Sequence, residues 1–372
     1  MSARHRARPV AGGDAATTPI PTASRAGRTS RVEWVDAAKG MSILLVVAHH
    51  TLWFLASTGQ APGPLVAANS ALASMRMPLF FLASGLFAAA PLAASWRTLL
   101  HKRVVFFLYL YVLWTVIRFL FFLALPGVVD PYNSADPVAL ALSLLLPGPG
   151  MWFLYALALF AVIGKLARPL PVWLQLGASG ILCALVGAGM VEFDNFAWTF
   201  MARYLFFFLL GCHARRLIEE PARSSSAATV VLAAVASAGG AAGAVALGIR
   251  GIPGVAFALN VLAVTFGVLF ASWISRYRVG SPLVVLGRQT LPVYLIHVLW
   301  LAVLMVGVQH LVLPTAARYA LPAVMALALT GLSLLTHRVL LKAGATALFA
   351  LPSRVAYRAP QPQLRLAAAA AS

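Results

Sequence analysis

Several side chains that can carry charge or a proton fall inside long apolar stretches of this sequence. A charged group at the centre of a membrane helix costs roughly 2.5–3.5 kcal/mol, so each one needs a partner, a cavity or a function. A buried histidine can act as a base, and a buried arginine can hold an anion. The groups concerned are, in chain order, His49, His50, Arg76, Arg118, Arg203 and His297.

Several of these groups are expected at one depth in the membrane. At about 1.5 Å of rise per residue, His50 lies about 16 Å beyond Lys39 along a helix. Arg76, Arg118 and Arg203 each fall roughly 10 Å from the opposite boundary, near the level of His50. The whole sequence has only 9 acidic residues to balance these cations. The shared depth therefore predicts a polar cavity that an anionic or phosphate-bearing ligand would complete.

Each of these residues also has a purely structural interpretation. A lone intramembrane arginine can extend to the interface or bind carbonyl groups at a helix end, and a histidine can bond to a nearby carbonyl. His49 and His50 are adjacent, so their side chains point about 100° apart and only one readily faces the cavity. Tyr294 and His297 share a helix face and either line the same cavity or pack in the core.

The amino-acid composition indicates that transmembrane helices position these groups. Of 372 residues, 61% are hydrophobic and 10% are charged, whereas a soluble domain has about a quarter charged residues. Long continuous apolar runs predict transmembrane helices, because every backbone group must be paired inside the bilayer. We therefore expect an all-α integral membrane protein with about ten spans in one bundle. The expected spans are 40–57, 70–90, 103–125, 150–167, 172–190, 197–217, 227–247, 254–275, 289–312 and 318–342.

The basic residues predict the orientation of the chain. The formal net charge of +19 could suggest nucleic acid, but the Lys and Arg residues lie mainly in alternate short loops and in the two tails. The positive-inside rule then predicts that both termini are cytoplasmic. We expect a plasma-membrane protein, and the placement of the charges argues against a nucleic-acid partner. We expect a disordered basic tail over 1–33, a transmembrane domain over 34–345, and a C-terminal tail over 346–372. A non-helical outer loop is expected around 126–149. Cys183 and Cys212 have no disulfide or metal-ligand spacing.

Five short motifs appear in a recognisable order along the chain. Together they resemble the motifs of acyltransferase family 3, a family of membrane-bound O-acyltransferases of about ten spans. The motifs are Arg31-x4-Asp36-x2-Lys39-Gly40 leading to His50, the Met77–Gly85 segment MPLFFLASG, the Trp152–Leu154 segment WFL, the Phe207–Gly211 segment FFLLG, and the Leu286–His297 segment LGRQTLPVYLIH.

The resemblance implies a function and a set of roles. It implies transfer of a short acyl group, acetyl or succinyl, from acyl-CoA to a hydroxyl of a sugar, glycan or lipid-linked acceptor, with acetyl-CoA the first candidate donor and no metal. His50 matches the family's essential histidine, and Arg76 and Arg118 are candidates for stabilising the oxyanion. Candidates for contact with CoA at the cytoplasmic end are Arg31, Asp36, Lys39, Arg97, Lys102 and Arg103. Candidates for lining the substrate cavity are Trp152, Arg203, Tyr294 and His297.

Alternatives remain open at this stage. His50 can act as a general base or can accept the acyl group covalently. A transporter or flippase for an anionic or glycan substrate would also use buried cations, and it predicts paired broken helices and repeat symmetry. A non-catalytic membrane scaffold descended from the same family is the third interpretation, although the retained His50, with Asp36 and Lys39, argues against it.

Overall fold

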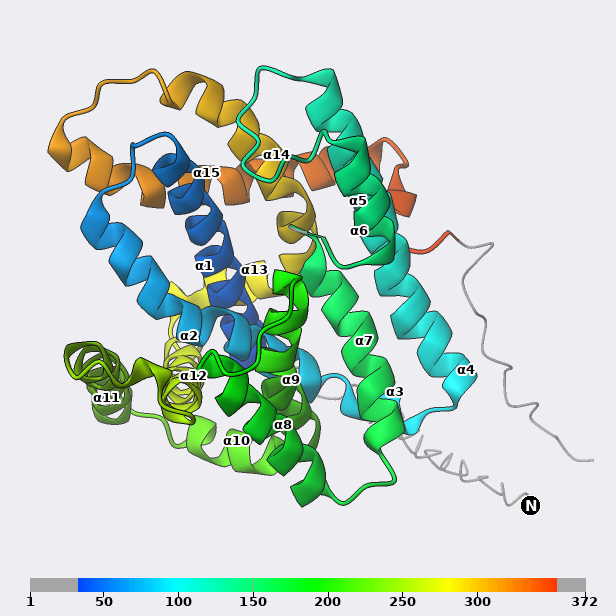
Figure 1. Ribbon diagram of the computed structural model, residues 1–372, viewed down its shortest axis with the longest axis vertical. Coiled ribbons are helices and arrows are strands. Elements are labelled where there is room, and N and C mark those ends of the chain that lie inside the picture. The colour runs from blue at the N-terminus through cyan, green and yellow to red at the C-terminus, as the bar shows by residue number, and fades with distance from the viewer. Residues whose placement is uncertain (1–32, 149, 353–372) are drawn as a thin grey trace, which may run out of the picture. The chain divides into compact units, whose positions relative to one another are not determined.

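The computed structural model describes residues 33–148 and 150–352. Within these residues every regular element is a helix, and no strand is present (Figure 1). The longer helices are α1 (Glu33–Ser57), α2 (Gly63–Leu86), α5 (Phe106–Ala124), α7 (Trp152–Ala167), α8 (Val172–Gly187), α9 (Phe196–His213), α11 (Ala227–Ala246), α12 (Val255–Ile274), α14 (Thr290–Val308) and α15 (Thr315–Lys342). Short elements connect them: α3 (Ala89–Ala93), α4 (Trp96–Leu99), the π-helical turn η1 (Leu100–Val105), α6 (Pro137–Leu145), α10 (Arg215–Arg223), α13 (Ser281–Gly287), and the 3-10 turns η2 (Ile249–Gly251), η3 (Arg278–Gly280) and η4 (Thr346–Leu348).

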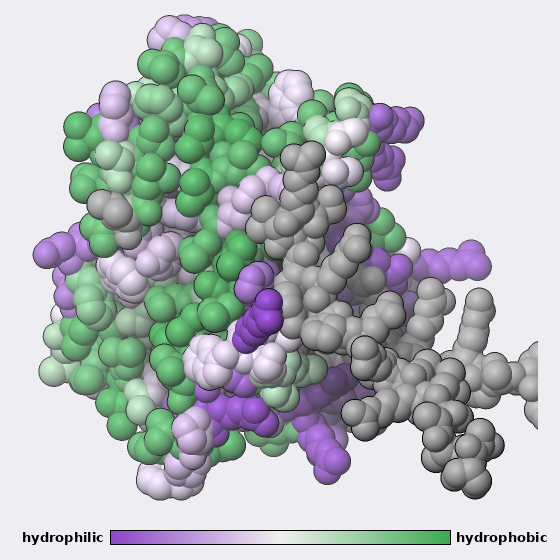
Figure 2. All heavy atoms as spheres, turned by 90° about the vertical axis from the view of Figure 1, so that its right-hand side faces the viewer, coloured by the Kyte–Doolittle hydropathy of each residue, from purple (hydrophilic) through white to green (hydrophobic). Residues whose placement is uncertain are grey.

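The helices agree with the spans expected from the sequence. Each expected span overlaps one long helix, and in the described part of the chain 8 helices are long and apolar enough to cross a membrane. Two more, α7 and α8, have 16 residues each and are shorter than a full span. The all-α membrane fold is therefore confirmed, while the exact number of spans and the side of the termini stay predictions. Figure 2 shows hydrophobic side chains over much of one flank, with hydrophilic ones gathered lower down.

The expected irregular outer loop is partly wrong, because it contains helix α6. Asp136 caps this helix, accepting a hydrogen bond from the backbone N–H of Val138 at 2.9 Å. Pro137 follows at the first helical position, where its missing N–H costs nothing. The buried Tyr111 of α5 then ties the end of α6 in place, since its hydroxyl donates to the Ser143 carbonyl and accepts from the Gly148 N–H at 3.0 Å.

Helix α1 lies inside the bundle, with α2, α12, α13, α14 and α15 packed around it (Figure 1). The motif glycines make two of the closest helix contacts. A Cβ on Gly85 of α2 would collide with the backbone of Phe208 on α9, and a Cβ on Gly211 of α9 would collide with the backbone of Leu82. Small residues allow helices to approach closely in membranes. These glycines therefore hold α2, which carries Arg76, against α9, which carries Arg203.

Candidate active site

The central feature of the site is a hydrogen-bonded pair of histidines. The Nδ1 atom of His50 on α1 lies 2.9 Å from Nε2 of His297 on α14. His297 is 1% exposed, and its own Nδ1 lies 2.8 Å from the carbonyl oxygen of Val293 one turn earlier. His50 itself is half-buried and faces a cavity. His297 was expected to line the substrate cavity, and the structure instead places it behind His50.

The Val293 carbonyl determines which nitrogens carry protons, provided both rings are neutral. A carbonyl only accepts, so Nδ1 of His297 must donate to it and Nε2 of His297 is left as an acceptor. His50 then donates from Nδ1, and its Nε2 keeps a lone pair. Among the described residues no hydrogen bond engages that Nε2 atom. His297 therefore holds His50 in the form that can accept a proton from a substrate.

A second relay starts from the neighbouring residue, His49. Nδ1 of His49 lies 2.9 Å from the amide nitrogen of Asn69. The amide oxygen of Asn69 accepts a hydrogen bond from Nη1 of Arg76, also at 2.9 Å. Arg76 is buried, with 6% of its surface exposed. Both relays therefore end at adjacent residues of α1, whereas the sequence analysis assigned a role to His50 and none to His49.

His49 and His50 both line a cavity of about 400 Å³, called here the upper chamber, although their adjacent positions predicted that only one of them would face it. Its walls are largely aromatic, and the described residues that line it include no carboxylate. Arg203 lies in the wall, with a long 3.4 Å hydrogen bond to the Gly187 carbonyl and a buried Nε atom that has no partner among the described residues. The lining residues used below are His49, His50, Trp53, Asn69, Arg76, Phe80, Tyr132, Trp152, Phe153, Phe200, Arg203, Tyr204 and Tyr294.

Arg118 does not line the upper chamber but lies against its wall, because a Cβ added to the lining residue Gly150 would meet the Arg118 guanidinium. Its guanidinium donates to Ser134 Oγ at 3.2 Å and lies 5.0 Å from the centre of the Tyr132 ring. Ser134 in turn donates to Asp130 at 3.0 Å, so a nearby carboxylate balances the charge of Arg118. Arg118 therefore supports the outer loop, while its buried Nη1 atom, on the side of Gly150, has no hydrogen-bond partner among the described residues. Its expected contact with the oxyanion stays a prediction.

Tyr132 connects this loop to the histidines. Its ring lies 6.3 Å from that of His50 and 4.5 Å from that of Trp53. Burial raises the pKa of the Tyr132 hydroxyl, so this group stays protonated near neutral pH. The outer loop thus covers the end of the upper chamber near His50 with a neutral aromatic side chain.

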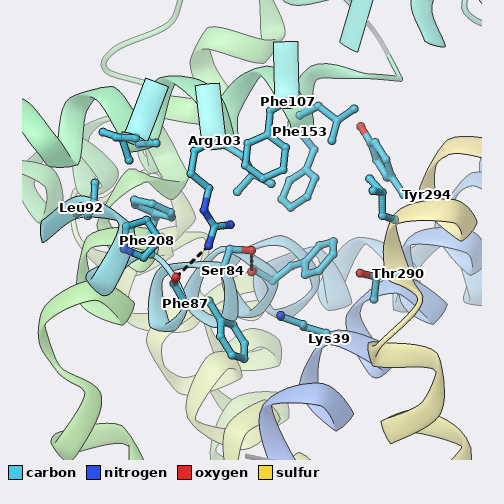
Figure 3. A pocket seen from close by; sticks show the side chains of 18 residues that line it. Lys39, Ser84, Phe87, Leu92, Arg103, Phe107, Phe153, Phe208, Thr290 and Tyr294 are labelled. Carbon is cyan, nitrogen blue, oxygen red and sulfur yellow. Dashed lines mark hydrogen bonds between the residues drawn. The ribbon is translucent and has the colours of Figure 1, made fainter. Parts of the chain in front are cut away.

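A smaller cavity of about 180 Å³, the lower chamber, lies toward the end of the bundle that carries Lys39 (Figure 3). Lys39 of α1 and Arg103 of η1 both extend into it, and the two cations meet around Phe87. The Lys39 ammonium lies 3.8 Å from the centre of the Phe87 ring, and Nη2 of Arg103 donates to the Phe87 carbonyl at 3.2 Å. The lower chamber therefore has a cationic rim and a mostly apolar interior, which also contains Ser84 and Thr290.

A thin aromatic wall separates the two chambers. Phe80, Phe153 and Tyr294 line both of them. The Phe80 and Phe153 rings stack with centres 4.6 Å apart, and the Tyr294 ring lies 5.6 Å from that of Phe153. The Tyr294 hydroxyl donates to the Gly150 carbonyl at 2.9 Å. These three side chains, which we call the aromatic wall, lie between the cations of the lower chamber and the histidines of the upper one.

The other candidates for CoA contact lie outside the lower chamber. Asp36 is 1% exposed and forms an ion pair of 3.2 Å with Arg288, which closes the contact between α1 and α13. Arg97 is exposed, and Lys102 lines a third cavity of about 540 Å³ together with Arg103. Arg31 lies outside the described residues. Of the expected residues that are described, Lys39 and Arg103 therefore meet at the lower chamber, and Lys102 and Arg103 meet at the third cavity.

Two contributors had no signal in the sequence, because Asn69 is an ordinary polar residue near a helix start and Tyr132 lies in a loop. A third, Arg288, lies in the Leu286–His297 motif, but its ion pair with Asp36 was not expected. Their importance depends on which residues they meet across the bundle. Among the described residues, no group of three or more His, Cys, Asp or Glu side chains could hold a metal ion.

Comparison with known families agrees with this architecture. A family model described as an acyltransferase domain matches residues 32–337, which is most of the chain and includes both chambers. The chain therefore belongs to acyltransferase family 3. No curated protein and no solved structure matches it. The protein is thus a multi-pass membrane acyltransferase, and the family assignment argues against the transporter interpretation.

Proposed function

We propose that this acyltransferase moves a short acyl group, acetyl first among candidates, from acyl-CoA to a hydroxyl of a sugar, glycan or lipid-linked acceptor. The observation that carries the proposal is the His50–His297 pair. It leaves one imidazole lone pair on the wall of the upper chamber, and a hydroxyl acceptor needs a base at that place. We further propose that the protein works in the plasma membrane with its basic face toward the cytoplasm.

The lower chamber suits the acyl donor. Lys39 and Arg103 offer two cations at its rim for CoA phosphates. The apolar interior suits the pantetheine arm, which carries the thioester toward the aromatic wall. The thioester must pass or displace part of this wall to reach His50, so the wall would limit both water access and the size of the acyl group.

The upper chamber suits the acceptor. Trp152, Phe200 and Tyr204 form a cluster, with ring centres 5.6 Å apart for Trp152 and Phe200 and 6.0 Å apart for Phe200 and Tyr204. Such surfaces fit the flat apolar faces of a sugar ring, and Arg203 beside them can donate to hydroxyls or to an anionic substituent.

The reaction then follows from these positions. His50 Nε2 takes the proton of the acceptor hydroxyl, and the oxygen attacks the thioester carbonyl. The tetrahedral intermediate collapses, the carbon–sulfur bond breaks, and His50 returns the proton to the CoA sulfur. Holding both substrates across one wall makes the encounter effectively intramolecular. In the covalent alternative the same Nε2 lone pair attacks the thioester carbonyl, the carbon–sulfur bond breaks and CoA leaves as the thiolate. The acceptor hydroxyl then displaces the acyl group from His50, and its proton goes to the CoA thiolate.

The test is transfer of radiolabelled acetyl from acetyl-CoA into envelope glycans or lipids. Membranes containing the wild-type protein are compared with membranes containing His50→Ala, with His337→Ala as a matched control because His337 lines neither chamber. We expect label to enter the acceptor fraction with wild type and control, and to fall to background with His50→Ala. Full activity in His50→Ala would overturn the proposed base. No transfer by folded wild type from acetyl-CoA or other acyl-CoAs would overturn the proposed reaction.

A further inference from the structure

We infer that His49 is a second catalytic residue, which donates a hydrogen bond from its Nε2–H to the oxyanion of the acyl-transfer intermediate. The inference rests on the proposed function and concerns the same upper chamber. Its basis is the relay from Arg76 through Asn69 to His49, whose direction follows from the chemistry of its members.

The direction of the relay begins at Arg76. A guanidinium has only donors, so the Asn69 oxygen must be the atom that accepts from it. This orients the amide, and its NH2 group then faces His49 Nδ1 at 2.9 Å. Nδ1 must therefore be the accepting nitrogen of His49. In the neutral ring the remaining proton is on Nε2.

The two adjacent histidines are therefore held in opposite tautomers. The Val293 carbonyl begins the other relay with an acceptor, so His50 carries its proton on Nδ1 and presents a lone pair. Arg76 begins the His49 relay with a donor, so His49 presents an N–H. The two rings have centres 5.2 Å apart, and both residues line the upper chamber. One histidine can accept the proton of the hydroxyl while the other faces the charge that develops on the carbonyl oxygen.

The His49 N–H is suited to hydrogen bonding and unsuited to proton transfer. Giving up the proton would leave an imidazolate, so His49 keeps it and stabilises the oxyanion through the hydrogen bond. The proton balance is complete without it, because His50 takes one proton from the hydroxyl and returns it to sulfur. Arg76 acts here as a positioning residue, since its positive charge polarises the relay toward the His49 N–H.

Two amide substitutions at position 49 separate this role from simple packing. The side-chain nitrogen of Gln reaches about as far as Nε2, whereas the amide of Asn reaches only to Nδ1. His49→Asn keeps the contact with Asn69 and removes the group facing the chamber. His49→Gln supplies an N–H near the former Nε2. We expect kcat to fall about 10²- to 10³-fold in His49→Asn, and less than about 10-fold in His49→Gln.

A structural role for His49 predicts the reverse order, because the contact with Asn69 would then be the one that matters. Equal or better activity of His49→Asn relative to His49→Gln, for folded protein, would overturn the inference. The tautomers are measured independently by 15N NMR of histidine-labelled protein, with the His49→Gln spectrum assigning the resonance. We expect protonated Nε2 at His49 and protonated Nδ1 at His50, and the opposite assignment at His49 would overturn the inference. The absence of any acyl transfer by folded wild-type protein would instead contradict the proposed function.

Discussion

Replacing His297 tests whether a buried neighbour controls the base. In His297→Leu the side chain still fills an apolar site between α1 and α14, but His50 loses the acceptor that holds its Nδ1–H. One net hydrogen bond is worth about 1 kcal/mol, or roughly a 5-fold effect. Complete loss of a general base costs about 10²- to 10⁴-fold. We therefore expect kcat to fall roughly 10- to 100-fold, between these limits.

The assay measures kcat and the acceptor KM for His297→Leu, His297→Gln and the control His337→Leu. Because His297 lies behind His50 and outside the chamber lining, the acceptor KM should stay within about 3-fold of wild type. The Gln side chain can again accept from His50, so His297→Gln should recover much of kcat. Unchanged kcat in folded His297→Leu would refute the assigned tautomer and the positioning role. A change confined to KM would instead place His297 in substrate binding.

Three further substitutions address the chambers and the wall. Arg103→Ala should raise KM for acyl-CoA about 10-fold or more through the lost charged contact, and a KM change for the acceptor alone would contradict the donor assignment of the lower chamber. Phe153→Leu should widen the aromatic wall, so the ratio of kcat/KM for longer over acetyl donors should rise; an unchanged ratio would show that the wall does not select acyl length. Gly150→Ala should destabilise the protein by about 1–3 kcal/mol in thermal unfolding, because the backbone φ of Gly150 is +87° and an added Cβ would meet the Arg118 guanidinium. Wild-type stability of this variant would contradict the packing.

Much of the fold follows from local sequence. The lengths of the apolar runs predict where the helices lie, and every expected span overlaps a helix. The error in the outer loop has a local cause, because an Asp-Pro pair capping a short apolar segment was not interpreted as the start of α6. Helices α7 and α8 are shorter than their expected spans. The sequence could not predict their ends, because the residues of the flanking turns are also apolar and resemble those inside the helices.

The candidate site was only partly accessible from sequence. The depth argument correctly brought Arg76 and Arg203 to the chamber that His50 lines, because depth follows from rise per residue and topology. It placed Arg118 there as well, since depth says nothing of the direction in which a side chain points. Arg118 lies beside the chamber wall at Gly150 and binds Ser134 of the outer loop, which in turn donates to Asp130.

The sequence by itself therefore determined the class of protein and the helices, and it predicted His50 as the central histidine, because these depend on composition, on local periodicity and on motifs in order. Tertiary structure alone decided which atoms meet. His50 and His297 lie on helices far apart in the chain, and the rotation of each helix about its axis is set by packing against several neighbours. That rotation turns His297 toward His50 and Asn69 toward His49. The proton positions on the two adjacent rings follow from those contacts.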